Sequence, residues 1–198
     1  MNALLASALL LIAVPAIAQD VAEPALRAEL LERLDAEQGV RMRLIAAGIA
    51  EPDPALLAEM DSIDTANLAH VVEIVDADGW PTPEAVGADG VNAAFLIVQH
   101  ADLGTQERML PLVEAAYEAG DLPGQSYSLL LDRVRVRRGE PQVYGTQTTP
   151  PGEWEDGTPG ILPTVDDATL DARRAEVGLP PIAEYIQMVK AMYQPDEG

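Results

Sequence analysis

The chain has 198 residues, of which 33 are Asp or Glu and 12 are Lys or Arg, and its formal net charge is −21. An apolar content of 48% is typical of a globular protein and not of a disordered acidic segment. The acidity argues against a nucleic-acid partner, because a phosphate backbone binds clustered cations. The absence of cysteine excludes disulfides, zinc–thiolate sites and cysteine nucleophiles.

The first eighteen residues have the pattern of a signal peptide. They contain no charged side chain, and an apolar run over residues 4–14 is followed by the small-x-small ending Ala16-Ile17-Ala18. The run is short for a membrane span, so an N-terminal anchor is the weaker alternative. We expect residues 1–18 to be removed and residues 19–198 to form a single exported domain, periplasmic or secreted, without a stable membrane anchor after cleavage.

Helical patterns cover most of the remaining chain. Over residues 25–47, an inward-facing stripe is predicted at Leu26, Leu30, Leu34, Gln38, Arg41 and Ile45, so two polar side chains are expected to face the interior. Thr82 and Pro83 have the types preferred at a helix N-cap and first helical position. Further helices are predicted over residues 54–75, 91–101, 125–131, 168–177 and 181–193, and between Gly104 and Gly120.

Residues 132–147 predict a β-hairpin. Arg and Val alternate with period two over residues 133–137, and Gly139-Glu140 suits a two-residue turn with glycine first. That register places Val136 opposite Val143, and Asp132 opposite Gln147 on the same face. The predicted fold class is therefore α+β, a mostly α-helical single domain with a small antiparallel hairpin. A Pro- and Gly-rich loop over residues 148–160 is expected to act as a flap.

The run Gln99-His100-Ala101-Asp102 ends the apolar helix predicted over residues 91–101. Amide, imidazole and carboxylate groups at a buried helix end need polar partners or a ligand, because each unpartnered group costs about 1–3 kcal/mol. One interpretation makes His100 a general base oriented by a carboxylate. The other makes Asp102 the N-cap of the next helix and bonds His100 to a backbone carbonyl. The residues leave both open.

A second polar group is predicted on the hairpin. Asp132 and Gln147 would share its core-facing side, which suggests a lined pocket with Tyr144 at its rim, although the same groups could serve only to hold the sheet. Arg133 begins a cluster of four arginines within residues 133–138. Such a cluster either binds an anionic ligand or forms an exposed basic edge that pairs with internal carboxylates.

We expect these segments to line one buried site, because polar groups buried separately would lack partners. The candidate catalytic residues are His100, Asp102 and Asp132, and the candidate ligand-binding residues are Gln38, Arg41, Gln99, Arg133, Tyr144 and Gln147. No metal is expected, because His70 and His100 are the only histidines and a bound metal needs three or four donors. The sequence does not indicate a cofactor.

In combination, the motifs resemble a bacterial family classed as domain of unknown function 6624, over about residues 26–185. They are Glu37-Gln38-x-x-Arg41, Gly79-Trp80-Pro81-Thr82, Val86-Gly87, Gln99-His100-Ala101-Asp102, Leu110-Pro111-Leu112, Asp132-Arg133-Val134, Pro141-Gln142-x-Tyr144-Gly145-Thr146-Gln147, Asp171-x-Arg173-Arg174, Gly178-Leu179 and Tyr185. Glu37 stands where Asp is expected. The resemblance implies a shared helical fold and a shared polar site, and it implies no activity.

Three classes of function remain open. The first is an exported enzyme, such as a hydrolase, with His100 as acid or base. The second is a module that binds a small molecule or a peptide through the same groups. The third is an interaction protein whose polar cluster is structural. Polar groups converging on one buried spot favour the first two classes.

Overall fold

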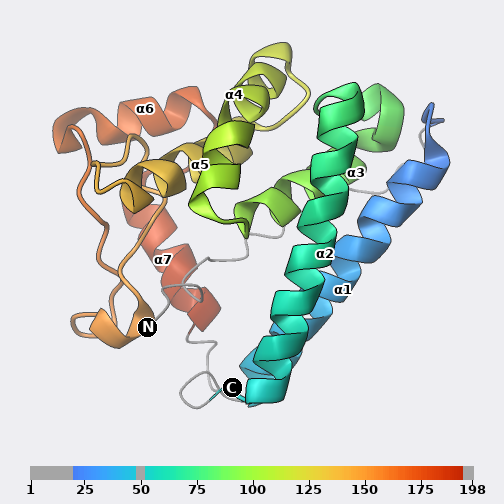
Figure 1. The fold of residues 1–198 in the computed structure, drawn as a ribbon. Coiled ribbons are helices and arrows are strands. Elements are labelled where there is room, and N and C mark those ends of the chain that lie inside the picture. Colours follow the sequence, from blue (N-terminus) through green and yellow to red (C-terminus); the bar gives the residue numbers. More distant parts are fainter. Residues whose placement is uncertain (1–19, 48–51, 194–198) are drawn as a thin grey trace. The chain divides into compact units, whose positions relative to one another are not determined.

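The computed structural model describes residues 20–47 and 52–193 of the chain (Figure 1). Within these ranges the α-helices are α1 (Pro24–Ala47), α2 (Pro54–Asp78), α3 (Pro83–Gln99), α4 (Leu103–Ala119), α5 (Gly124–Arg137), α6 (Leu170–Glu176) and α7 (Ile182–Tyr193). Short 3-10 helices occupy Pro151–Glu153 and Asp167–Thr169. The described chain divides into two compact units, an N-terminal unit (residues 20–122) and a C-terminal unit (residues 123–193). That the chain forms one domain stays a prediction.

The fold is helical, and the predicted α+β class is wrong. Residues 133–137 lie in α5, and β structure in the described ranges is limited to isolated bridges. Five alternating residues are too few to exclude a helix, and α5 buries Tyr127, Leu130 and Val134 at helical spacing. The predicted hairpin register, with Val136 opposite Val143, is therefore wrong as well.

The residues interpreted as a hairpin turn instead end a helix. Gly139 has φ 75°, its N–H donates to the carbonyl of Val136, and the N–H of Glu140 donates to the carbonyl of Arg135. This pair of hydrogen bonds is the Schellman arrangement, which satisfies the last carbonyls of a helix and requires a left-handed residue after it. Gly139 is thus the sequence feature that marks the C-terminal end of α5.

Helix α1 follows the prediction closely in length but not in the face it buries. The buried residues are Leu30, Glu37, Val40 and Leu44, whereas Ile45 is 55% exposed. Between Leu26 and Ile45 a straight helix turns about 100° beyond five full turns, so the two ends of the predicted stripe cannot share one face. The seven-residue spacing from Leu30 to Leu44 puts Glu37 into the interior.

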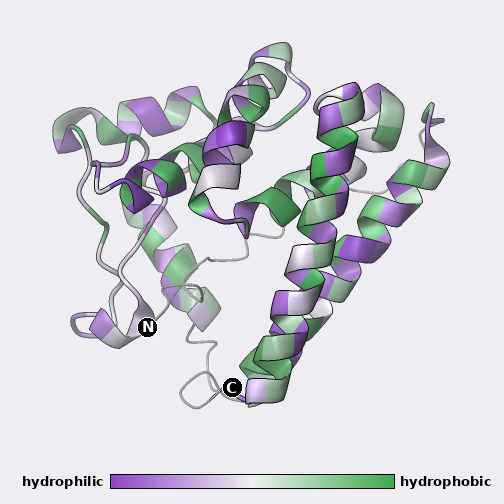
Figure 2. Ribbon diagram, in the orientation of Figure 1, coloured by the Kyte–Doolittle hydropathy of each residue, from purple (hydrophilic) through white to green (hydrophobic). Residues whose placement is uncertain are grey.

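The N-terminal unit is a set of packed helices in which α1 contacts both α2 and α3. Figure 2 shows hydrophilic and hydrophobic residues alternating around α1 and α2, as expected for helices with one buried face. Thr82 caps α3 by accepting a hydrogen bond from the N–H of Ala85, as predicted. Helix α3 is interrupted at Gly87 and then buries Phe95 and Val98, so its second half runs through the core and brings His100 to its C-terminal end.

The predicted signal peptide lies outside the described residues. Across residues 20–47 and 52–193, no helix combines the length and the apolar character that a membrane crossing requires.

Candidate functional site

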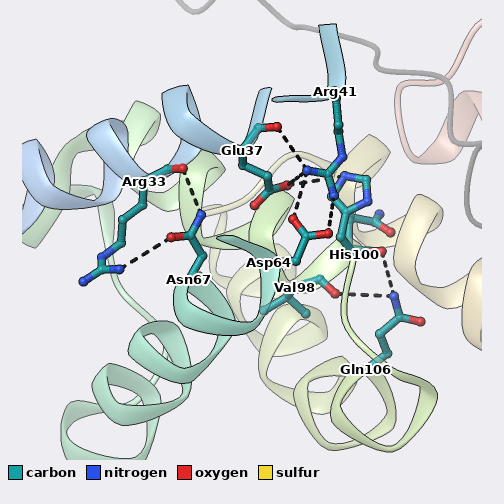
Figure 3. A network of polar contacts seen from close by, with 9 residues as sticks. Arg33, Glu37, Arg41, Asp64, Asn67, Val98, His100 and Gln106 are labelled. Atoms are coloured by element: carbon teal, nitrogen blue, oxygen red, sulfur yellow. Dashed lines mark hydrogen bonds and ion pairs between the residues drawn. The ribbon is translucent and has the colours of Figure 1, made fainter. Parts of the chain in front are cut away.

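Four charged or titratable side chains of the N-terminal unit come together in what we call the Glu37 cluster (Figure 3). Glu37 and Arg41 lie one turn apart on α1, Asp64 comes from α2, and His100 is the C-cap residue of α3. Arg41 donates from Nη1 and Nη2 to the two carboxylate oxygens of Asp64 at 3.0 and 2.9 Å. Nη1 also donates to the main-chain carbonyl of Glu37 at 3.2 Å. The guanidinium is therefore fixed between two helices.

Glu37 is the most buried member of the cluster, with a side chain only 1% exposed. Its Oε1 lies 3.4 Å from Nη1 of Arg41 and 3.6 Å from Nε2 of His100. Both distances exceed the 2.7–2.9 Å of a charge-assisted hydrogen bond. Among the described residues, neither carboxylate oxygen accepts a well-formed hydrogen bond. The carboxylate is thus buried with weakly placed donors, of which Arg41 lowers its pKa more than Asn67 does.

Burial raises the pKa of Glu37 to about 7. The charge of Arg41 opposes this rise, and the nearby carboxylate of Asp64 adds to it. Because Arg41 is bound in two places to Asp64, the cluster offers Glu37 little uncompensated positive charge. Desolvation therefore dominates, and the carboxyl group exchanges its proton near neutral pH.

His100 is more exposed than Glu37 but less exposed than Asp64, whose side chain is 24% exposed. The side chain of His100 is 12% exposed, compared with 1% for Glu37. The end of α3 beside it is held by Gln106, whose Nε2 donates to the carbonyls of Gln99 and Val98 at 2.8 and 3.4 Å. Gln106 is fully buried on α4, and it satisfies the helix-end carbonyls that would otherwise compete for nearby donors.

A second row of polar contacts connects α1 and α2 next to the Glu37 cluster. Arg33 bonds to Glu29 at 2.8 Å, and Nε2 of His70 lies 3.3 Å from the same carboxylate. The amide of Asn67 donates to the carbonyl of Arg33 at 2.9 Å. In the described ranges no group of three His, Cys, Asp or Glu side chains is arranged to hold a metal ion.

Asp102 caps α4. Its Oδ1 accepts from the N–H of Thr105 at 3.0 Å and its Oδ2 accepts from the hydroxyl of Thr105 at 2.7 Å. These bonds, led by the one from the hydroxyl, lower the pKa of Asp102. The residue is exposed. The structure therefore shows the capping arrangement, one of the two interpretations that the sequence left open.

Asp132 organises a loop of the C-terminal unit. Its carboxylate is fully buried and accepts hydrogen bonds from the N–H groups of Val143, Tyr144 and Thr146 at 2.6–3.2 Å, and from the hydroxyl of Thr146 at 3.0 Å. Burial raises the pKa of Asp132, and these amide donors oppose the rise. Gln147 donates to the hydroxyl of Thr146 at 3.0 Å, so it joins the same network without the predicted strand pairing.

Two motif residues that were not predicted as site residues, Arg174 and Tyr185, hold the same loop from the other side. Arg174 is fully buried and donates to the carbonyls of Tyr144 and Pro180 at 2.6 Å each. Its guanidinium stacks 4.8 Å from the ring centre of Tyr185, whose hydroxyl donates to the carbonyl of Thr146 at 2.7 Å. Burial, as the main cause, raises the pKa of Tyr185 to about 12. These contacts give residues 144–146 a fixed shape.

The remaining predicted residues of the C-terminal unit surround this loop. Burial lowers the pKa of Arg133 to about 10, and the charge of Arg137 adds to that effect. The ring of Tyr144 packs edge-on against Tyr127, with centres 6.4 Å apart. The predicted flap is pinned at its base, where Thr149 and Gly160 bond to one another and the indole of Trp154 donates to the carbonyl of Thr149.

A family model described as "Family of unknown function (DUF6624)" matches residues 24–195. The chain belongs to this family. The match confirms the resemblance inferred from the sequence. No curated protein and no solved structure matches the chain.

The structure of this family member brings Arg41 and His100 together around Glu37, and Asp64 joins them. It gathers Asp132, Tyr144 and Gln147 around one loop of the C-terminal unit. That all these residues share one site stays a prediction. The sequence did not predict Glu37 as a site residue, because the inward face of α1 was inferred from Leu26, Leu30 and Leu34, which are four positions apart. The heptad spacing from Leu30 to Leu44 would have revealed it.

Proposed function

We propose that the protein is an exported enzyme whose acid–base centre is the pair formed by Glu37 and His100. The observation that carries this proposal is the 3.6 Å approach of Glu37 Oε1 to His100 Nε2, at a carboxyl group whose pKa is raised to about 7. General acid–base catalysis works best when the pKa of the group lies near the working pH. Active sites raise carboxyl pKa values in this way, by burial.

The two residues take different roles because they differ in exposure. Of the pair, His100 is the one with exposed surface, 12% against 1% for Glu37, so His100 is the group that contacts substrate and Glu37 is the positioning residue. Arg41 and Asp64 fix the cluster between α1 and α2. A base of this kind can activate water, which suits a hydrolase without a side-chain nucleophile.

Asp102 and Asp132 are left out of the centre. The carboxylate of Asp102 is engaged in capping α4, and that of Asp132 in holding residues 143–146. The oxygens of both carboxylates already accept several hydrogen bonds, so they have little capacity left to bond to a substrate.

A second candidate function is a binding module that uses the same cluster without turnover. The observation that favours it is the amide of Gln38, whose oxygen and nitrogen are both buried without a hydrogen-bond partner among the described residues. Such an amide can hydrogen-bond to a ligand that is bound without being converted, as well as to a substrate.

The test is a hydrolase screen of the chain from Gln19 onward, followed by His100→Ala. We expect a loss of about 100-fold or more in kcat/KM, the usual contribution of a general acid or base. His70→Ala is the matched control, because His70 also contacts a glutamate, at 3.3 Å, and belongs to the second row of contacts. Equal activity of His100→Ala and the parent would exclude the proposed centre. Thermal stabilisation by a ligand without turnover would favour the binding module.

Export belongs to the same proposal. The sequence Ala16-Ile17-Ala18 predicts cleavage before Gln19, so the intact mass of the protein from its own host should correspond to a chain that starts there. A membrane-bound product that keeps Met1 would contradict export without affecting the acid–base centre.

A further inference from the structure

Gln38, in the N-terminal unit, has a side-chain amide whose hydrogen-bonding capacity is unused among the described residues. It lies on α1 directly after Glu37 and one turn before Arg41. Both polar atoms of its amide are buried, and neither has a hydrogen-bond partner in the described ranges. A buried amide normally bonds through both atoms, since an unpartnered one destabilises the fold. The arrangement indicates that the partner of Gln38 comes from outside the described residues.

Gln142, in the C-terminal unit, shows what satisfies a buried glutamine in this protein. Its Oε1 accepts from the N–H of Gln147 at 2.8 Å, and its Nε2 donates to the carbonyl of the same residue at 2.9 Å. Nε2 also donates to the carbonyl of Leu162 at 2.7 Å. The side-chain amide thus bonds to both the donor and the acceptor of one main-chain residue. An extended peptide presents such a donor and acceptor on the same side of each residue.

The charges around Gln38 decide between classes of ligand. Arg41 is the nearest cation on α1, and its charge is taken up by Asp64 and by the neighbouring Glu37. An anionic ligand would therefore meet no free positive charge from this cluster. A neutral group that offers one donor and one acceptor fits both the charge and the unused amide.

We propose that Gln38 bonds to the main-chain N–H and C=O of one residue of an extended peptide, so that the Glu37 cluster takes peptides as its ligands. This inference rests on the proposed function, in that it assigns a substrate class to the same centre. The role of Gln38 is to position the peptide next to His100, and it takes no part in proton transfer.

The first test compares Gln38→Met with Gln142→Met, two replacements of a glutamine by an apolar side chain of similar length. Gln142→Met removes three internal hydrogen bonds and should lower Tm. Gln38→Met removes none and should leave Tm unchanged or raise it. A fall in Tm for Gln38→Met as large as that for Gln142→Met would show that the amide is satisfied within the protein, and would overturn the proposal.

The second test measures binding of a pool of N-acetylated, C-amidated tetrapeptides to the chain from Gln19 onward, by competition or calorimetry. The parent should bind this pool at least tenfold more tightly than the same pool N-methylated at the central residue, and Gln38→Met should bind both pools equally. Equal binding of the two pools by the parent, or no binding, would overturn the proposal. Binding of acetamide in place of the peptides would assign the site to small carboxamides and would also overturn it.

The two proposals can fail separately. If His100→Ala abolishes turnover while Gln38→Met keeps the discrimination between the two pools, the acid–base centre stands and the role of Gln38 is wrong. If Gln38→Met loses the discrimination while His100→Ala keeps full activity, peptides bind at the cluster and the catalytic assignment of His100 is wrong.

Discussion

Glu37 and Asp132 both carry buried carboxylates, one in each unit, and they differ in what surrounds them. Asp132 accepts bonds from three main-chain N–H groups and one hydroxyl, at 2.6–3.2 Å. Glu37 has a guanidinium at 3.4 Å, an imidazole at 3.6 Å and the amide of Asn67 nearby, and none of them makes a well-formed hydrogen bond to its oxygens. Burial raises the pKa of both groups, but only at Asp132 do several backbone amides oppose it.

The comparison separates a structural carboxylate from a reactive one. A carboxylate that accepts several amide bonds stabilises the loop that supplies them, and it has little capacity left for a substrate. A carboxylate buried without such bonds destabilises the fold whenever it is charged, and proteins retain such groups mostly at functional sites. The difference between the two residues is thus the reason for placing the acid–base centre in the N-terminal unit.

The largest effect is expected for Asp132→Asn. Asparagine has one acceptor oxygen, and its NH₂ group would face main-chain N–H groups that now donate to Asp132. We expect a loss of about 3 kcal/mol or more in the free energy of unfolding, because several buried donors lose their acceptor. Denaturant unfolding measures it. Asp156→Asn is the control, because Asp156 is exposed and its φ of 51° is well tolerated by Asn. A change below about 1 kcal/mol would mean that Asp132 is not the structural carboxylate of the pair.

Glu37→Gln should raise the free energy of unfolding, in contrast to Asp132→Asn, and it should do so only above acidic pH. The pKa of Glu37 is about 7 in the folded chain and 4.5 as a free side chain, so the folded state holds the proton more tightly. The stabilisation from that proton is complete below pH 4.5 and is lost as the pH rises through 7. The difference between the two pKa values corresponds to about 3 kcal/mol of unfolding free energy, which the parent loses between pH 4.5 and pH 8. Glu37→Gln has no such proton to lose, so it should be more stable than the parent at pH 8 by about that amount.

The measurement for Glu37→Gln is the free energy of unfolding of parent and variant from pH 4.5 to pH 8. Glu32→Gln, at an exposed position of the same helix, should leave the pH dependence of the parent unchanged. Parallel curves for the parent and Glu37→Gln would show that Glu37 titrates normally, and the contrast with Asp132 would disappear.

The sequence predicted the helices of the N-terminal unit well, because their caps and apolar faces are local features. Thr82 and Pro83 marked the start of α3, and the apolar run after residue 90 marked its buried half. The sequence also associated Asp132 with residues 144–147, but through a strand pairing that does not exist. The real link is a side chain that bonds to the backbone of a distant loop, and no periodic pattern records such a contact.

The same limit applies to the Glu37 cluster. Arg41 and His100 were predicted as site residues. Asp64 lies in a predicted helix and belongs to none of the motifs, so no pattern in the sequence was a reason to select it. Its role follows from the way α2 packs on α1, a tertiary contact between residues 23 positions apart. Gln106 was missed for the same reason, since its partners are carbonyl groups at the end of the preceding helix.

Asp102→Ala tests whether a third carboxylate belongs with Asp132 or with Glu37. If Asp102 only caps α4, the variant should lose about 1 kcal/mol in the free energy of unfolding and keep its activity within a few-fold of the parent. Asp53→Ala is the matched control, because Asp53 caps α2 by accepting from the N–H of Ala55 at 2.8 Å. If Asp102→Ala instead lost activity by about 100-fold with little change in stability, Asp102 would be a catalytic residue after all.

Asp64→Asn should give the smallest effect and the most specific one. Asp64 raises the pKa of Glu37 by its own charge, and it also binds Arg41 in two places. Without that charge, Arg41 stabilises the Glu37 carboxylate more effectively, so the pKa of Glu37 should fall from about 7 by less than about one unit.

A ¹³C NMR titration of the glutamate side-chain carboxyl groups measures this shift, with the Glu37 signal assigned by its loss in Glu37→Gln. The acid limb of the pH–activity profile should move in the same direction, because the same proton is involved in catalysis. A titration midpoint that stays or rises in Asp64→Asn would mean that burial alone sets the pKa of Glu37. In that case Arg41 and Asp64 only hold α1 against α2, and they contribute to the centre through its geometry.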